Sequence, residues 1–184
     1  TWSEGASDVR RALLRTGDGA DRIEIDTGIY LSRIEMGAGN DRLSVGWGAW
    51  DTQIDMESGD DRITLFGGAR LDLQAGSGND EVQLQDIGAG PLTVSTSYGQ
   101  DHVRITGSGV QRASPIDPMS VLLGPDDDRL EVGGAAIGNA LFDGGTGLDA
   151  YIDLDNTFVS GPPELRSFEL PKTTLGPALE IPTR

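Results

Sequence analysis

The 184-residue sequence contains no cysteine and only one histidine, His102. The missing thiols exclude disulfide bridges, zinc–thiolate sites and cysteine nucleophiles, and a single histidine excludes multi-histidine metal sites. No apolar run approaches the roughly 18 residues that a membrane-spanning helix needs, so we expect no membrane insertion. Aromatic residues make up 5% of the chain and hydrophobic residues 36%. These low fractions leave little material for a thick hydrophobic core.

Acidic residues dominate the charge. The chain has 30 Asp and Glu against 14 Lys and Arg, a formal net charge of −16. Such a charge disfavours nucleic acid and anionic membrane surfaces as partners, because both are polyanions. It suits a chain that holds cations. Glycine is also abundant, at 27 residues, about twice its average usage.

A repeat runs through most of the sequence. The segments TGDGADRIEI, MGAGNDRLSV, MESGDDRITL and AGSGNDEVQL align without gaps, and weaker copies follow as SYGQDHVRIT, GPDDDRLEV and DGGTGLDAYI. Every copy carries an aspartate at one fixed position. These aspartates are Asp21, Asp41, Asp61, Asp80, Asp101, Asp128 and Asp149. Their spacings of 20, 20, 19, 21, 27 and 21 residues predict a repeat architecture.

Two alternating runs occur in each unit. After the aspartate, apolar and polar residues alternate, as in Ile23 and Ile25 around Glu24, and a second run such as Ile34 and Met36 follows later. Period two is typical of half-buried strands, and one such unit cannot bury its apolar face alone. We therefore predict an all-β, parallel β-solenoid (β-helix or β-roll) of about seven coils of about 20 residues, with two strands per coil. An antiparallel sandwich also has short alternating strands, but it would not repeat the same turn only once in every two turns.

The repeat also divides the chain. We expect the solenoid over residues 16–154, an N-terminal cap over 1–15, and a C-terminal cap strand with a proline-rich tail over 155–184, because solenoids need protected ends. The longer interval before Asp128 predicts a protruding loop at 107–120.

The turn before each aspartate has the chemistry of a cation site. Its glycines permit positive φ and expose backbone carbonyls, and the aspartate adds a carboxylate. Stacked turns would bring these oxygens together, and oxygen-rich sites suit Ca²⁺. The candidate calcium ligands are Gly17, Gly19, Asp21, Gly37, Gly39, Asn40, Asp41, Gly59, Asp60, Asp61, Gly76, Gly78, Asn79, Asp80, Asp101, Asp128, Gly145, Gly147 and Asp149.

These copies resemble the nonapeptide G-G-x-G-x-D-x-h-x of the repeats-in-toxin (RTX) family of calcium-binding repeats. Residues 144–152 match every fixed glycine and aspartate, and the copies at 16–24, 36–44 and 75–83 miss only the first glycine. The resemblance implies a calcium-bound parallel β-roll in a secreted or cell-surface bacterial protein, with ligands from the sixth-position aspartate and turn carbonyls. The motif occupies one edge of each coil, so we expect one row of ions.

We therefore expect a calcium-binding structural or adhesive module that extracellular calcium folds or rigidifies. A metal-free scaffold is the alternative, because aspartates also stabilise turns by bonding backbone, although stacked like charges without a counter-ion are destabilising. A polysaccharide-modifying enzyme is a weaker alternative. It would need an acid–base pair, and the sequence marks no such constellation, so we expect no enzyme.

Two further features allow a glycan or another surface protein as partner. Tyr30 and Trp50 occupy equivalent positions on the other edge, where they would either bind sugar rings or stack on each other. Arginines follow the aspartate in four copies, where they would either grip a polyanionic glycan or offset neighbouring acids such as Glu24 and Glu131. These arginines are Arg22, Arg42, Arg62 and Arg129.

Overall fold

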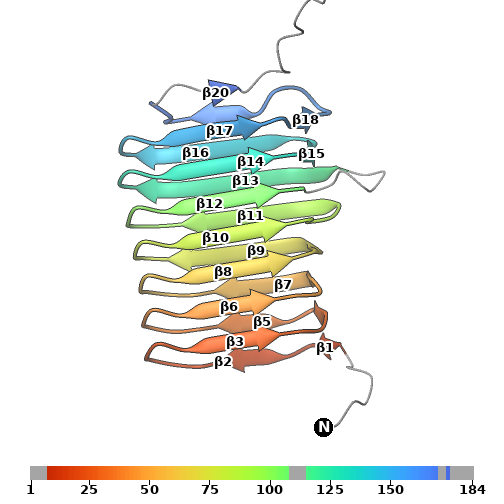
Figure 1. Cartoon of the computed structure of the whole chain (residues 1–184), viewed down its shortest axis with the longest axis vertical. Coiled ribbons are helices and arrows are strands. Elements are labelled where there is room, and N and C mark those ends of the chain that lie inside the picture. Colours follow the sequence, from red (N-terminus) through yellow and green to blue (C-terminus); the bar gives the residue numbers. More distant parts are fainter. Residues whose placement is uncertain (1–7, 108–114, 170–172, 175–184) are drawn as a thin grey trace, which may run out of the picture.

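The computed structural model describes residues 8–107, 115–169 and 173–174. These residues form a β-solenoid of about seven coils, in which two parallel sheets lie back to back along a rod (Figure 1). The paired strands are parallel throughout, as in the pairs β6–β8 and β7–β9, and the described residues contain no helix. The predicted fold class is thereby confirmed, and the antiparallel sandwich is excluded. Within the described residues no helix is long and apolar enough to cross a membrane.

Each coil contributes to both sheets. The first sheet contains β1 (Val9–Arg10), β2 (Leu13–Arg15), β4 (Ile29–Tyr30), β5 (Arg33–Glu35), β7 (Ala49–Asp55), β9 (Gly68–Gly76), β11 (Gly90–Thr96), β13 (Ile116–Pro125), β15 (Ala136–Ile137), β16 (Ala140–Thr146), β18 (Thr157–Phe158) and β19 (Glu164–Arg166). The second sheet contains β3 (Arg22–Ile25), β6 (Arg42–Val45), β8 (Arg62–Phe66), β10 (Glu81–Gln85), β12 (His102–Thr106), β14 (Arg129–Gly133), β17 (Ala150–Leu154) and β20 (Thr173–Thr174).

The core is a set of aliphatic columns between the two sheets. In-register pairing places Ile34 beside Ile54 and Ile54 beside Leu73 in the first sheet. In the second sheet, Leu43 lies beside Ile63. All of these side chains are buried, as the alternation in the sequence predicts. Each coil therefore buries its apolar residues only by stacking on its neighbours.

Aromatic residues enter the core at the C-terminal end. Phe142 is fully buried and its ring lies 5.3 Å from that of Tyr151, which in turn lies 5.9 Å from Phe168. These larger rings cover the last aliphatic layer. The short strand β19, from the segment expected to supply a cap strand, pairs with β16 at this end.

Strands also form in two segments where the sequence predicted a cap and a loop: the N-terminal end and the long interval before Asp128. β1 and β2 pair with β4 and β5, so Val9–Arg10 and Leu13–Arg15 already belong to the first sheet. In the interval expected to protrude, residues 108–114 lie outside the described residues, and β13 begins at Ile116. The second half of that interval is therefore strand.

Candidate metal centre

The glycine–aspartate turns lie on the left edge of the rod in Figure 1, between the end of each first-sheet strand and the start of the next second-sheet strand. The turns stack on one another through backbone hydrogen bonds, such as the one from Gly39 N–H to Ser58 O at 2.7 Å. Gly39 has φ of 138°, and a Cβ there would lie 2.0 Å from the carbonyl oxygen of Gly19. Gly59 and Gly78 meet the preceding turn in the same way. Glycine is therefore required both by backbone conformation and by the closeness of the neighbouring coil.

One turn lacks a glycine that its neighbours have. Glu57 stands where the flanking copies have Gly37 and Gly76, and it adopts φ of 71°. Ser58 N–H donates to Gly37 O over 3.3 Å, whereas the equivalent bond in the next coil, from Ser77 N–H to Glu57 O, spans 3.0 Å. A non-glycine residue in the left-handed region costs about 1–2 kcal/mol. This turn therefore stores strain that the two flanking turns avoid.

We expect Glu57→Gly to stabilise the protein by about 1 kcal/mol, because glycine removes that strain although it adds freedom to the unfolded chain. The melting temperature should rise by about 2–4 °C for a domain of this size. Thermal unfolding followed by circular dichroism measures the effect. Glu57→Ala is the control, because it removes the charge but keeps a Cβ in the left-handed region. Equal gains in both variants would show that charge, and not backbone strain, limits this turn.

The seven repeat aspartates, hereafter the aspartate column, are linked from coil to coil. From Asp41 to Asp149, the Oδ1 atom of each aspartate accepts a hydrogen bond from the backbone N–H of the aspartate in the preceding coil, at 2.7–2.9 Å. From Asp21 to Asp128, the backbone carbonyl of each aspartate accepts a hydrogen bond from the following coil, as in Arg62 N–H to Asp41 O at 2.9 Å. The carboxylate thus serves as the acceptor for an N–H group at the corner of the coil.

At the C-terminal end of the column, the acceptor is a residue outside the repeat. Asp149 N–H donates to Glu169 Oε2 at 3.3 Å, so the carboxylate of Glu169 replaces the aspartate that an eighth coil would supply. Sequence alignment could not find this residue, because Glu169 lies in the tail, outside the repeat. Its only signal is a spacing of 20 residues from Asp149.

The second oxygen of every aspartate in the column has no partner. The Oδ2 atoms are buried and accept no hydrogen bond among the described residues. Asp41, Asp61 and Asp80 are each 2% exposed, and Asp149 is fully buried. A buried carboxylate oxygen without a partner is costly while the group is ionised. The column therefore requires neutralisation by a proton or by a cation.

Burial weakens the acidity of the column. Loss of hydration raises the pKa of Asp61 and Asp80 to about 7, against an ordinary value of 3.8, although the backbone N–H bonds oppose this shift. Asp128 has its pKa raised to about 7 by the same cause. Burial raises the pKa of Asp101 less far, to about 6, because the Thr96 hydroxyl favours the charged form and opposes the shift. These four carboxyls titrate near neutral pH in the absence of a metal.

A second ladder follows the exposed side of the same turns and runs in the opposite sense. Asn40 Oδ1 accepts from Asp60 N–H at 3.0 Å, Asp60 Oδ1 accepts from Asn79 N–H at 2.8 Å, and Asn79 Oδ1 accepts from Gln100 N–H at 2.8 Å. Here the side chain of one coil accepts from the backbone of the following coil. The three candidate ligands Asn40, Asp60 and Asn79 therefore lie apart from the buried column, with one oxygen each already engaged.

The candidate residues gather on one edge but do not form a compact acidic cluster. The turn glycines Gly17, Gly19, Gly76, Gly145 and Gly147 all have positive φ and lie in the same stack of turns as the column. Within the described ranges no three His, Cys, Asp or Glu side chains converge on a point that could hold a metal ion. A cation at the column would therefore draw most of its ligands from backbone carbonyls and water.

The other two features have structural partners. The rings of Tyr30 and Trp50 stack on each other with centroids 4.5 Å apart and an angle of 8° between planes. Arg129 Nη2 lies 2.6 Å from Glu131 Oε1, and Arg22 pairs with Glu24. Tyr30 and Trp50 therefore stack on each other, and Arg22 and Arg129 pair with neighbouring acids, which is one of the two interpretations of each feature.

No protein-family model matches this sequence, and the curated proteins and solved structures compared with it contain no significant match. The resemblance to the RTX repeats therefore rests on the turn residues themselves.

Proposed function

We propose that this chain is a structural and adhesive β-solenoid module of a secreted or cell-surface bacterial protein, and that calcium neutralises its aspartate column. The observation that carries this proposal is the row of seven buried Oδ2 atoms without a hydrogen-bond partner. Seven carboxylates on adjacent coils repel one another when ionised. A divalent cation is the partner that would offset both the repulsion and the lost hydration.

The donor set fits a hard cation. Asp41, Asp61 and their equivalents would each supply an Oδ2 atom, and the glycine turns would supply carbonyl oxygens. Bound calcium would bring two positive charges and a demand for about six to eight oxygen ligands. All of the donors in these turns are oxygens, which hard cations prefer over softer metals.

The metal-free scaffold has a specific observation in its favour. From Asp41 to Asp149, every Oδ1 atom in the column already accepts an inter-coil hydrogen bond. An aspartate can therefore serve the turn through one oxygen alone, with a proton on the other. The two functions differ in what neutralises Oδ2, so calcium dependence separates them.

Export would make the calcium dependence useful. Cytosolic calcium is scarce, so the ionised column would hold the chain loose before export. Extracellular modules bind calcium at about 10⁻⁴–10⁻³ M, and binding to the folded state alone appears as folding free energy. The acidic turns would thus couple folding to arrival outside the cell. This supports a secreted or surface location as part of the proposal.

Far-UV circular dichroism with thermal melts tests the proposal directly. At pH 8, we expect the melting temperature in chelator to rise by on the order of 10 °C or more as calcium reaches millimolar concentration. Magnesium should substitute poorly, because it demands a small octahedral site. A melting temperature that does not change with calcium would contradict the calcium proposal and favour the metal-free scaffold.

Two variants of Asp61 separate the roles of its oxygens. Asp61→Asn keeps an Oδ1 acceptor for Asp41 N–H but removes the charge, so it should be at least as stable as the wild type in chelator and gain less from calcium. Asp61→Ala leaves that N–H without a partner and should lose about 1–3 kcal/mol with or without calcium. An unchanged calcium gain in Asp61→Asn would contradict the assignment of this carboxylate as a ligand.

A further inference from the structure

The outer face of the second sheet carries the opposite charge from the rest of the molecule. Its outward strand positions hold five arginines against three glutamates, a net positive charge of two, while the whole chain carries −16. We call this surface the arginine face. Its arginines are Arg22, Arg42, Arg62, Arg104 and Arg129, and its glutamates are Glu24, Glu81 and Glu131.

Arg42 is the cation on this face without a counter-charge. It lies in register between Arg22 on one side and Arg62 on the other. Arg62 pairs with Glu81 of the next coil, and Arg22 also has an acidic partner. No carboxylate among the described residues forms an ion pair with the exposed Arg42 guanidinium. Three arginines on adjacent strands repel one another, so an external anion at Arg42 would relieve this repulsion.

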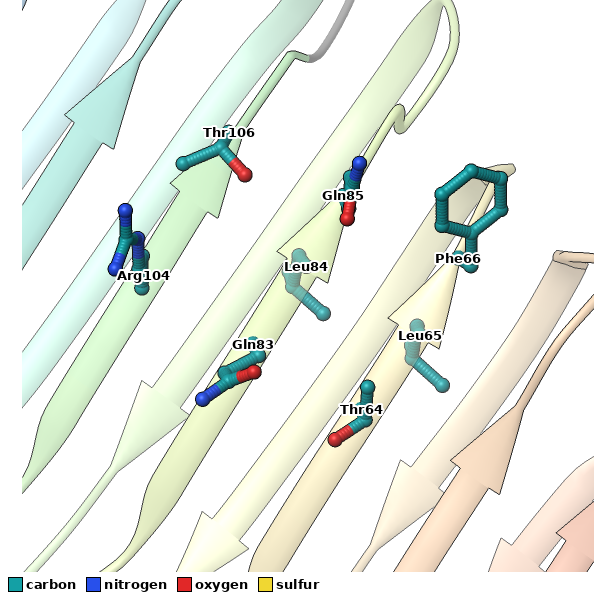
Figure 2. Close-up of a pocket in the computed structure, with 8 residues that line it drawn as sticks. All are labelled: Thr64, Leu65, Phe66, Gln83, Leu84, Gln85, Arg104 and Thr106. Carbon is teal, nitrogen blue, oxygen red and sulfur yellow. The ribbon is translucent and has the colours of Figure 1, made fainter.

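A shallow hollow of about 230 Å³ lies farther along the same face. Figure 2 shows its two rows of side chains: Thr64, Gln83 and Arg104 cross neighbouring strands in one row, and Phe66, Gln85 and Thr106 in the next. The lining thus combines hydroxyl, amide, guanidinium and aromatic groups and contains no acid.

Phe66 and Arg104 are two members of this lining whose exposed groups could contact a ligand. Phe66 is 47% exposed although it is a large apolar side chain. Arg104 approaches Glu131 Oε2 at only 3.6 Å, and the same carboxylate also pairs with Arg129 at 2.6 Å and His102 at 3.4 Å. Most of the Arg104 donors therefore remain available to a ligand.

We propose that the arginine face binds an extended polysaccharide whose sugar rings carry carboxylates. Arg42 and Arg104 would each take a carboxylate, which the guanidinium fork binds through two parallel hydrogen bonds. Phe66 would pack against the apolar face of a sugar ring, and Gln83, Gln85 and Thr64 would bond hydroxyls. A flat, periodic surface favours a linear, periodic ligand over a globular partner. This site deepens the adhesive role proposed above and rests on it, but it does not depend on calcium at the turns.

Titration calorimetry with oligogalacturonate, a carboxylated sugar chain, tests this site. The protein is kept at a calcium concentration at which circular dichroism shows it folded. We expect binding that weakens with added salt, and a loss of about tenfold in affinity for the double variant Arg42→Gln, Arg104→Gln. Phe66→Ala should lose about fivefold. All three positions are solvent-exposed, so the circular dichroism spectrum should not change.

The matched control is Arg33→Gln, which removes an exposed arginine from the opposite sheet and should bind as the wild type does. Neutral glucan, sulfated dextran and single-stranded DNA are the comparison ligands. Absent binding, equal losses in the control variant, or tighter binding of sulfated dextran or DNA would each overturn the proposal. None of these outcomes would affect the calcium titration, so the two proposals fail separately.

Discussion

Without divalent cations, the protein should melt at a lower temperature at pH 8 than at pH 5, by on the order of 10 °C. Burial raises the pKa of Asp61, Asp80 and Asp128 from an ordinary value of 3.8 to about 7. A group with a raised pKa in the folded state binds protons more tightly there than in the unfolded chain. Its stabilisation is complete below about pH 4 and is lost as the pH rises through 7. Thermal melts in chelator across this range measure the loss.

Calcium should reverse this dependence. Ionised aspartates bind the cation and protonated ones do not, so the calcium gain should be largest at pH 8 and smallest at pH 5. The double variant Asp61→Asn, Asp80→Asn removes two of the titrating groups while keeping their Oδ1 acceptors. It should show a shallower pH dependence in chelator. A wild type whose melting temperature in chelator rises between pH 5 and pH 8 would show that the column is neutralised in some other way.

Gly39→Ala should destabilise the protein by about 3 kcal/mol, or about 6–12 °C. The added Cβ would lie 2.0 Å from the carbonyl oxygen of Gly19, and φ at this position is 138°. The obstacle is backbone in a hydrogen-bonded stack, which cannot turn aside as a side chain could. The coils would have to separate at this edge, with loss of the bonds between them.

The first coil provides the control for this substitution. Gly19 has φ of 124°, but no atom of the described residues lies within 4 Å of the place where its Cβ would be. Gly19→Ala therefore carries the conformational strain without the collision and should cost only about 1–2 kcal/mol. The difference between the two variants measures the close packing of successive turns. Equal losses would show that backbone strain alone requires these glycines.

The sequence was sufficient to predict the fold, because a single repeat length, that of one coil, sets the positions of the strands and turns. Residues such as Ile34 and Ile54 recur at the coil length and alternate with polar neighbours, and in-register stacking follows from both facts. The turns were equally visible, since Gly37 and Asp41 mark them. These features are local and repeated, and a single sequence displays them directly.

The chemistry of the site depends on contacts that no repeat encodes. The sequence marks Asp61 but does not indicate that one of its oxygens bonds the preceding coil while the other is buried without a partner. Arg42 and Arg62 look equivalent along the chain. Only the register between coils places Glu81 beside Arg62 and leaves Arg42 without an acid. Phe66 lines a hollow only because Gln85 and Thr106 follow it on the next strands.

The two ladders that run in opposite senses along the glycine edge have a mechanical consequence. A force that pulls the ends of the rod apart loads every interface between coils in series, so the weakest interface yields first. On the glycine edge, side chains from both coils tie the interface between the Asp41 and Asp61 turns. On the opposite edge, the same two coils are joined by backbone bonds such as Leu31 N–H to Trp50 O and by the stacked rings of Tyr30 and Trp50. Under tension, two coils would therefore separate first at the opposite edge and rotate apart about the glycine edge, where the side-chain bonds still hold them together.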